Sequence, residues 1–196
     1  IGNQESYLSK TEPVTKILRP DCGRDFRKIS LKEKASMLRN YSNIITNYHS
    51  KIQSSIVNYT DRYTTVYYAN SEGTYIQQEK PFLSVHFAAI ARNGDDVQMA
   101  SESIGSVKGY DSAERLSSIA QKTARRAINL LKAAPVQGGE YTVILDPVLA
   151  GVFIHEAFGH LSEADFLYED PRMQELMKLG KRVGPPELNV VDDGSL

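Results

Sequence analysis

The sequence predicts an α+β fold, in which helices cover a mostly antiparallel sheet of about five strands, followed by the start of a β-rich C-terminal domain. Three observations predict this fold. Apolar residues recur at helical spacing over 31–49 and again over 112–133. Between these stretches, over 55–107, apolar and polar residues alternate with the period of two that a half-buried strand requires. A further strand-like pattern follows residue 180.

The composition is that of a folded globular protein and excludes several classes of function. Of the 196 residues, 41% are hydrophobic and 24% are charged, which excludes a disordered or fibrous chain. The net charge is -1, without the basic excess of a nucleic-acid binder. No apolar run approaches the ~18 residues of a membrane span. The lone Cys22 cannot form an internal disulfide, which favours the cytoplasm.

The organisation of the chain predicts three parts. We expect an N-terminal irregular segment and helix over 1–54, an α/β domain over 55–180, and a truncated β-rich C-terminal domain beginning at 181–196. The chain begins with Ile1 rather than Met, and a strand pattern at 188–191 has no returning strand after it. An open strand edge is a liability, so we expect that the chain is cut short at both ends.

Two segments resemble helix starts with side-chain caps. The stretch from Ser30 to Glu33 has the form of a capping box and opens the helix expected over 31–49. The stretch from Asp111 to Glu114 repeats this pattern and opens the helix expected over 112–133. Residues 1–29 are mixed and polar, and we expect them to be irregular.

Short strands and turns fill the region between these helices. Asn70 to Gly73 reads as a turn, and Asn93-Gly94 is the strongest hairpin signal in the chain, because both residues accept a positive φ. The expected strands are 63–68, 74–79, 83–91 and 97–107.

The last third of the chain predicts short elements. Residues 141–145 read as a short buried strand, and Asp146 caps a helix whose first residue is Pro147. A second short helix is expected from Asp170-Pro171, ending at Gly180. Its expected buried residues are Met173, Leu176 and Met177, and the remaining expected elements are a strand at 188–191 and a turn at 192–194.

The sequence His155-Glu156-x-x-x-His160 is the candidate for chemistry. Two histidines that flank a glutamate are typical of a zinc site, but in the familiar zinc helix they are four residues apart. Five residues apart on a regular helix, their side chains diverge by roughly 140°. We therefore expect the helix to end or be distorted between them, with Gly159 stopping it in a left-handed conformation.

The residues alone leave two interpretations of this motif open. In the first, His155 and His160 bind zinc while Glu156 acts as a general base toward water. In the second, the histidines donate to backbone carbonyls and Glu156 caps a helix or pairs with a cation. The residues alone support the two equally.

The segment from Gly151 to Asp165 closely resembles the TldD/PmbA family of zinc metallopeptidases, which were once called modulators of DNA gyrase. It is similar to the TldD branch, which keeps the motif, rather than to the PmbA (TldE) branch, which has lost it. The segments Asn70–Gly73, Lys80–Phe82 and Val191–Gly194 also resemble parts of that family. The resemblance covers about residues 55–196.

The resemblance implies a zinc metallopeptidase that degrades or processes small or unfolded peptides in the cytoplasm. His155 and His160 would bind the zinc, and Glu156 would activate water. A cysteine from the C-terminal domain would be the third ligand, and this chain lacks it. We therefore expect this fragment to hold zinc weakly or not at all and to be inactive.

The family further implies a dimer, either of two copies or with a PmbA/TldE-like subunit. The balanced charge and the lack of a long apolar run predict no nucleic acid or membrane partner. One alternative is a non-catalytic regulatory or scaffold subunit of such a dimer. Another is a nucleic-acid-associated factor, which the older family name suggests and the balanced charge opposes.

Residues outside the motif complete the candidates. Glu163 and Asp165 either orient a histidine of the motif or are solvated, and the residues support both options equally. His86 is expected on a strand face opposite Leu83, Val85 and Phe87, and His49 at the end of a helix, so both are expected to be structural or exposed. Cys22 lies in a segment without a matching motif and is not expected to bind zinc.

Overall fold

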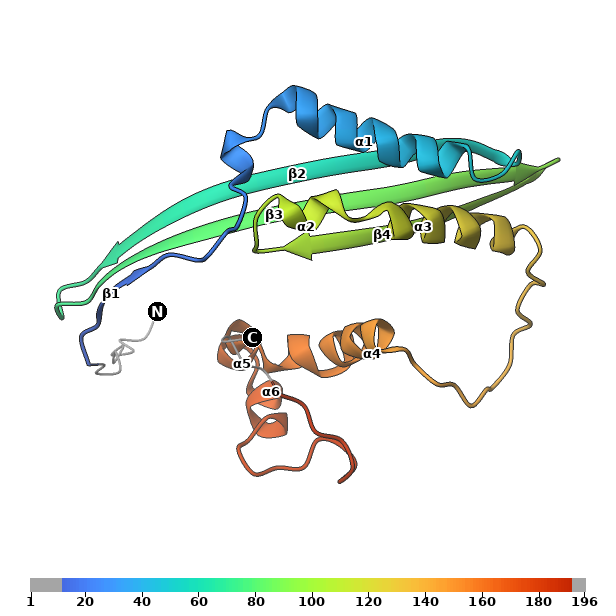
Figure 1. Cartoon of the computed structure of the whole chain (residues 1–196). Coiled ribbons are helices and arrows are strands. Elements are labelled where there is room, and N and C mark those ends of the chain that lie inside the picture. Colours follow the sequence, from blue (N-terminus) through green and yellow to red (C-terminus); the bar gives the residue numbers. More distant parts are fainter. Residues whose placement is uncertain (1–11, 192–196) are drawn as a thin grey trace. The chain divides into compact units, whose positions relative to one another are not determined.

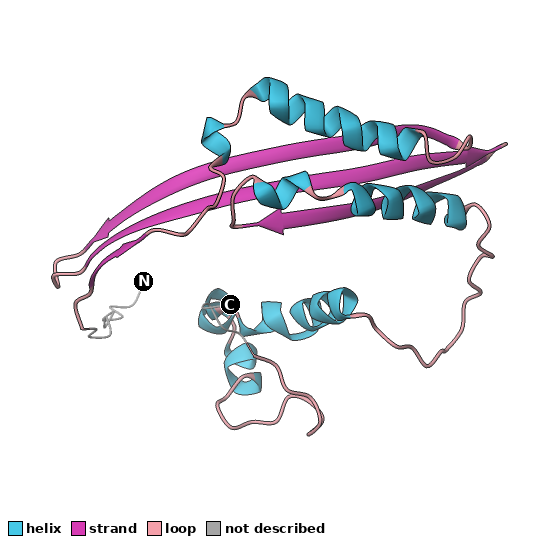
Figure 2. Cartoon of the chain, in the orientation of Figure 1, coloured by secondary structure: helices cyan, strands magenta, loops and turns pink. Residues whose placement is uncertain are grey.

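The computed structural model describes residues 12–191, which belong to two compact units that divide between Pro135 and Val136 (Figure 1). The N-terminal unit is a sheet with helices on it, and the C-terminal unit is a series of short helices and loops (Figure 2). The α+β fold class predicted from the sequence is confirmed.

The sheet of the N-terminal unit has four strands, with β3 in the centre. On one edge of β3 lies β2, which is antiparallel to it. On the other edge, β1 pairs in parallel with the start of β3, and β4 pairs antiparallel with its second half. The strands are β1 (Thr15–Leu18), β2 (Ile52–Ala69), β3 (Tyr75–Asn93) and β4 (Asp96–Ser106).

The prediction of about five strands is wrong by one. The strands expected at 74–79 and 83–91 are one continuous strand, β3, and the short strand β1 was not predicted. Pro81 does not interrupt β3. On the edge that β1 and β4 share, the ladder with β1 ends at Gln78 and that with β4 begins at Leu83. Pro81 lies in the gap between them, where a missing N–H breaks no pairing on that edge.

The N-terminal segment is more regular than its composition suggests. Residues 1–29 were predicted to be irregular, yet β1 and the 3-10 turn η1 (Phe26–Lys28) both fall within them. The strand β1 is only four residues long and pairs with a segment 60 residues further along the chain, at Tyr75. Such a strand shows no alternation of its own and is defined by its partner.

One layer of helices covers the sheet (Figure 2). It consists of α1 (Leu31–Thr46), α2 (Asp111–Glu114) and α3 (Ser117–Leu130). As predicted, the Ser30 side chain caps α1 by accepting from the Glu33 N–H at 3.2 Å. The largest fully buried side chains of the N-terminal unit are Tyr41, Tyr110, Phe26, Phe87, Ile45, Leu83, Val85 and Thr123.

The single helix predicted over 112–133 is two helices, because the Tyr41 hydroxyl bonds on both sides of the break: it donates to the Ala113 carbonyl and accepts from the Leu116 N–H at 3.2 Å. The chain before α2 also packs against the N-terminal segment. A Cβ on Gly109 would lie 1.6 Å from the Cys22 carbonyl oxygen, so only glycine fits there. The Tyr110 N–H donates to the Arg24 carbonyl at 2.8 Å. Asp111 accepts from the Arg24 N–H at 2.9 Å instead of capping the helix with its side chain.

Two helices of the C-terminal unit start where the sequence predicted. Asp146 accepts from the Leu149 N–H at 2.8 Å and caps the first helix, and Asp170 accepts from the Arg172 N–H at 2.8 Å and caps the last. The elements in order are α4 (Pro147–Ile154), the π-helical turn η2 (His155–Gly159), the 3-10 turn η3 (His160–Ser162), α5 (Ala164–Glu169) and α6 (Pro171–Leu176).

Other predictions for this unit are wrong, because the segments lack partners among the described residues. Residues 141–145 and 188–191 form no strand, and Ile144 is 98% exposed. Helix α6 ends four residues before Gly180 and leaves Leu176 exposed, with Met173 and Met177 only half-buried. The turn predicted at 192–194 lies outside the described residues. Throughout 12–191, no helix combines the length and apolar character needed to cross a membrane.

Candidate metal centre

The candidate motif lies on a helix whose hydrogen-bond pattern changes within the motif. Helix α4 continues without a break into η2, where the His160 N–H donates to the His155 carbonyl, five residues earlier. An i to i+5 bond defines a π turn, a feature found frequently at functional sites. The predicted distortion between the histidines is confirmed. The predicted left-handed stop at Gly159 is wrong, because its φ of -55° and ψ of -54° are right-handed helical values.

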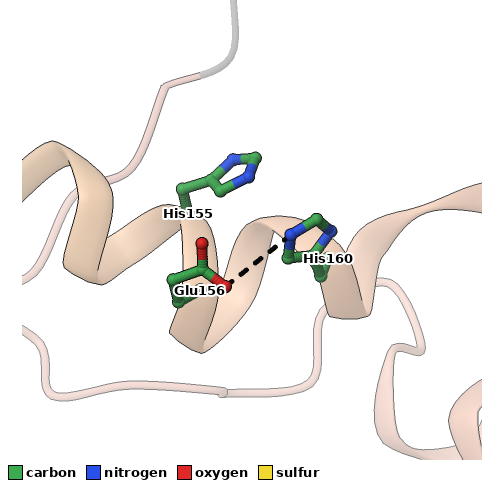
Figure 3. Close-up of side chains that lie close together, drawn as sticks. All are labelled: His155, Glu156 and His160. Carbon is green, nitrogen blue, oxygen red and sulfur yellow. Dashed lines mark ion pairs between the residues drawn. The ribbon is translucent and has the colours of Figure 1, made fainter.

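The π turn brings the two histidines together. A turn closed at i+5 places residue i+5 above residue i, whereas the 3.6-residue α turn separates them by roughly 140°. The ring centroids of His155 and His160 are 4.4 Å apart. In Figure 3 both rings lie on the same side of the helix, with the Glu156 carboxylate beside them.

His155, Glu156 and His160 form a group that fits a metal ion. Each offers one ligand atom, and these three atoms lie within 4.8 Å of one another. The distance from Glu156 Oε2 to His160 Nε2 is 3.7 Å. Two imidazole nitrogens and one carboxylate oxygen are donors that zinc accepts, and all three side chains are exposed to an entering ion.

His160 is held by a second carboxylate on its other ring nitrogen. Its Nδ1 lies 2.6 Å from Glu163 Oε1. The Glu163 carboxylate, with a smaller contribution from Glu156, raises the pKa of His160 above its ordinary value. Of the two options left open for Glu163, the structure therefore shows the contact with a histidine. Asp165 makes no such contact, and its carboxylate accepts from the neighbouring Phe166 N–H at 3.0 Å.

The other candidates lie in the N-terminal unit and bind local partners. His86 is half-buried, with its Nδ1 2.9 Å from Ser103 Oγ. His49 follows α1, three residues beyond its end, and its Nδ1 accepts from the Lys51 N–H at 3.0 Å. The Cys22 thiol contacts the Pro20 carbonyl at 3.5 Å. Among residues 12–191, the candidate metal cluster contains none of them.

An apolar cavity of about 570 Å³ lies against the same helix and was not predicted from the sequence. Its walls are residues of α4 and η2 together with the segment 182–190, and none of the three cluster residues lines it. The cavity residues on the helix are Phe153, Ile154, Ala157 and Phe158. The candidate ligands and the apolar wall of the cavity therefore belong to the same helix but are different residues.

Comparison with known proteins supports an assignment to a family. The profile of the PmbA/TldA metallopeptidase central domain matches residues 24–131, and that of the C-terminal domain of the same proteins matches 138–196. The chain belongs to the PmbA/TldD metallopeptidase family. The resemblance inferred from the motif is confirmed by these matches. They begin at residue 24, so the predicted limit of the resemblance at about residue 55 is wrong.

Individual relatives agree with this assignment to the PmbA/TldD family. A metalloprotease of Synechocystis is 44% identical over 193 residues, which are 98% of this chain and 42% of the relative. A Saccharolobus solfataricus protein described as a zinc metalloprotease TldD homolog is 33% identical over 95% of this chain and 40% of its own length. The chain thus spans about two fifths of these relatives.

A solved structure shares the fold of this PmbA/TldD chain. A Bacteroides thetaiotaomicron protein described as a candidate modulator of DNA gyrase aligns with 73% of this chain and 33% of its own length. The TM-score is 0.61 and the sequence identity 21%. At that identity the likeness concerns the fold.

Proposed function

We propose that this chain carries the metal-binding helix of a zinc metallopeptidase, in which His155 and His160 bind zinc and Glu156 is the general base. The observation that carries the proposal is the π turn at 155–159, which brings these three groups within 4.8 Å of one another. A regular helix would point the two histidines in different directions. Membership in a family of metallopeptidases supports the same function.

The chemistry follows from the side chains. Zinc bound by the two imidazoles would polarise the carbonyl of a peptide and make water more acidic. Glu156 takes a proton from the attacking water while the water oxygen forms a bond to the carbonyl carbon. Glu156 then gives this proton to the amide nitrogen as the carbon–nitrogen bond breaks. The products are a carboxylic acid and an amine, which exchange a proton to become a carboxylate and an ammonium group, and no oxidant or further reactant is needed.

We propose small or unfolded peptides as substrates and the cytoplasm as the compartment. The exposure of His155, Glu156 and His160 supports the first, because an extended peptide can reach them. The lone cysteine supports the second. A dimer of two copies, or with a PmbA/TldE-like subunit, is the assembly that the family resemblance supports.

The replacement Glu156→Gln in the active full-length protein tests the role of Glu156. An amide cannot take a proton from water, so we expect turnover to fall by about 10²–10⁴-fold while zinc content is unchanged. Peptide hydrolysis and zinc content are measured on the same samples. Glu169→Gln, which removes an exposed carboxylate at the end of α5, is the matched control and should keep full activity.

Two outcomes would contradict this assignment. Loss of zinc together with turnover would make Glu156 a ligand rather than a base, which its distance of 3.7 Å from His160 Nε2 permits. Unchanged turnover would remove Glu156 from the mechanism. A wild-type protein that binds zinc but hydrolyses no peptide would instead support the non-catalytic regulatory subunit.

A further inference from the structure

We propose that Glu163 is a positioning residue that fixes the tautomer and orientation of His160. Its carboxylate holds the proton of this ring on Nδ1, which leaves the Nε2 lone pair facing Glu156 and free to bind a metal. The consequence for zinc binding rests on the function proposed above, but the tautomer itself does not.

The two nitrogens of the His160 ring face two different carboxylates. Nδ1 lies 2.6 Å from Glu163 Oε1, and Nε2 lies 3.7 Å from Glu156 Oε2. A carboxylate accepts hydrogen bonds and donates none, so the closer partner, Glu163, favours a proton on Nδ1. Glu156 is beyond hydrogen-bonding distance and does not compete for that proton.

The backbone holds Glu163 in the position from which it reaches the ring. Its N–H donates to the His160 carbonyl at 3.3 Å and closes η3, and its φ of -67° and ψ of 135° then end the helical path. Its own carbonyl accepts from the Leu167 N–H at 3.2 Å at the start of α5. Bonds on both sides therefore fix the backbone of the residue, so that only its side-chain torsions remain to be ordered when it contacts His160.

The two histidines of the motif differ in whether a ring nitrogen has a hydrogen-bond partner. Among residues 12–191, His155 has a ring contact with His160 but no hydrogen bond to either ring nitrogen. Histidine ligands of metals nearly always donate their second N–H to a carboxylate, carbonyl or water, and removing that partner typically weakens metal binding by about 10–100-fold. Within the described part of the chain, Glu163 is this partner for His160.

The ring nitrogens of the zinc-free chain report the tautomer directly by ¹⁵N NMR. The spectrum is recorded at a pH above the end of the His160 titration, which is followed in the same sample, and His160 is assigned by its loss in His160→Ala. We expect Nδ1 of His160 to carry the proton in the wild-type chain. In Glu163→Ala we expect the proton to move mainly to Nε2, the form that neutral imidazole prefers in water.

Two further variants distinguish positioning from charge. Glu163→Gln keeps an oxygen that can accept from Nδ1 and should keep the wild-type tautomer. Asp165→Asn removes a carboxylate two residues away that does not touch a histidine, and should leave the ring unchanged. A wild-type His160 protonated on Nε2, or a change in Asp165→Asn as large as in Glu163→Ala, would overturn the proposal.

Zinc titration of the same variants separates this proposal from the function on which it builds. We expect zinc to bind Glu163→Ala about 10–100-fold more weakly than the wild-type chain, with Glu163→Gln between them. Equal affinities, with zinc still bound at His155 and His160, would overturn the positioning role and leave the proposed function intact. The expected tautomer without any zinc response at these histidines would support the positioning of His160 and contradict the proposed metal site.

Discussion

His160 makes more contacts than any other residue of the motif. Its N–H bonds to the His155 carbonyl, its ring lies against the His155 ring, and its two ring nitrogens face the carboxylates of Glu163 and Glu156. The π turn places its ring 4.4 Å from that of His155, and Glu163 binds its Nδ1. The sequence predicted the three motif residues and the need for a distorted helix. It left open whether Glu163 contacts the motif. Two side chains three residues apart meet only in some backbone turns, and the sequence did not specify the turn after His160.

The titration of His160 should respond to Glu163. The carboxylate raises the pKa of His160, so Glu163→Ala should lower the pKa toward the ordinary value of ~6.5. A folded-state pKa above the unfolded value stabilises the folded chain below the unfolded pKa, and this contribution is lost as pH rises through the folded pKa. Proton NMR titration of the zinc-free chain measures the shift. Equal pKa values in the wild-type chain and the variant would show that the pair does not form in solution.

At the scale of single elements, the helix that carries the motif is continuous but changes its hydrogen-bond pattern twice along its length. α4 is α-helical, η2 is π-helical and η3 is 3-10, and Ser162 Oγ donates to the Gly159 carbonyl at 2.8 Å near its end. The sequence signalled a break through Gly159, yet the structure uses this glycine inside the helix. A Cβ at this position would meet His155 Nδ1 at 3.4 Å, an ordinary contact.

Substitution of two glycines by alanine tests this account of the motif helix. Gly159 has right-handed helical angles, so Gly159→Ala should stabilise the C-terminal unit by about 0.5–1 kcal/mol. Gly180 has a φ of +81°, so Gly180→Ala should destabilise the loop by about 1–2 kcal/mol. Urea unfolding followed by far-ultraviolet circular dichroism measures both. A loss of helix in Gly159→Ala would mean that this residue needs the left-handed conformation after all.

Sequence patterns predicted an element correctly where its hydrogen-bond partners are a few residues away, and missed it where they are distant in the sequence. The caps at Ser30, Asp146 and Asp170 are confirmed because each accepts from an N–H two or three residues away. The break between α2 and α3 was missed because the groups beside it bond to the distant Tyr41 hydroxyl, which no local pattern records. The strand β1 was missed for the same reason, since it is defined by its pairing with Tyr75.

At the scale of the whole molecule, the two units differ in how much they bury. In the N-terminal unit the helices and the sheet enclose a core in which Leu83, Val85 and Phe87 are fully buried, at the alternate positions of β3 that the sequence predicted. In the C-terminal unit none of residues 136–191 is buried. The strands predicted there, at 141–145 and 188–191, require partners that the described residues do not provide, whereas the helices close their own hydrogen bonds.

We propose that His155 and His160, alone among the four histidines of this chain, bind a metal ion. The most direct measurement is the ¹⁵N NMR spectrum of the histidine rings during addition of zinc in excess, which detects weak as well as tight binding. We predict that ring nitrogens of His155 and His160 shift together, while those of His49 and His86 do not. Shifts at His49 or His86 instead, or signals of His155 and His160 that stay unchanged in excess zinc both in this chain and in the full-length protein, would contradict the metal site.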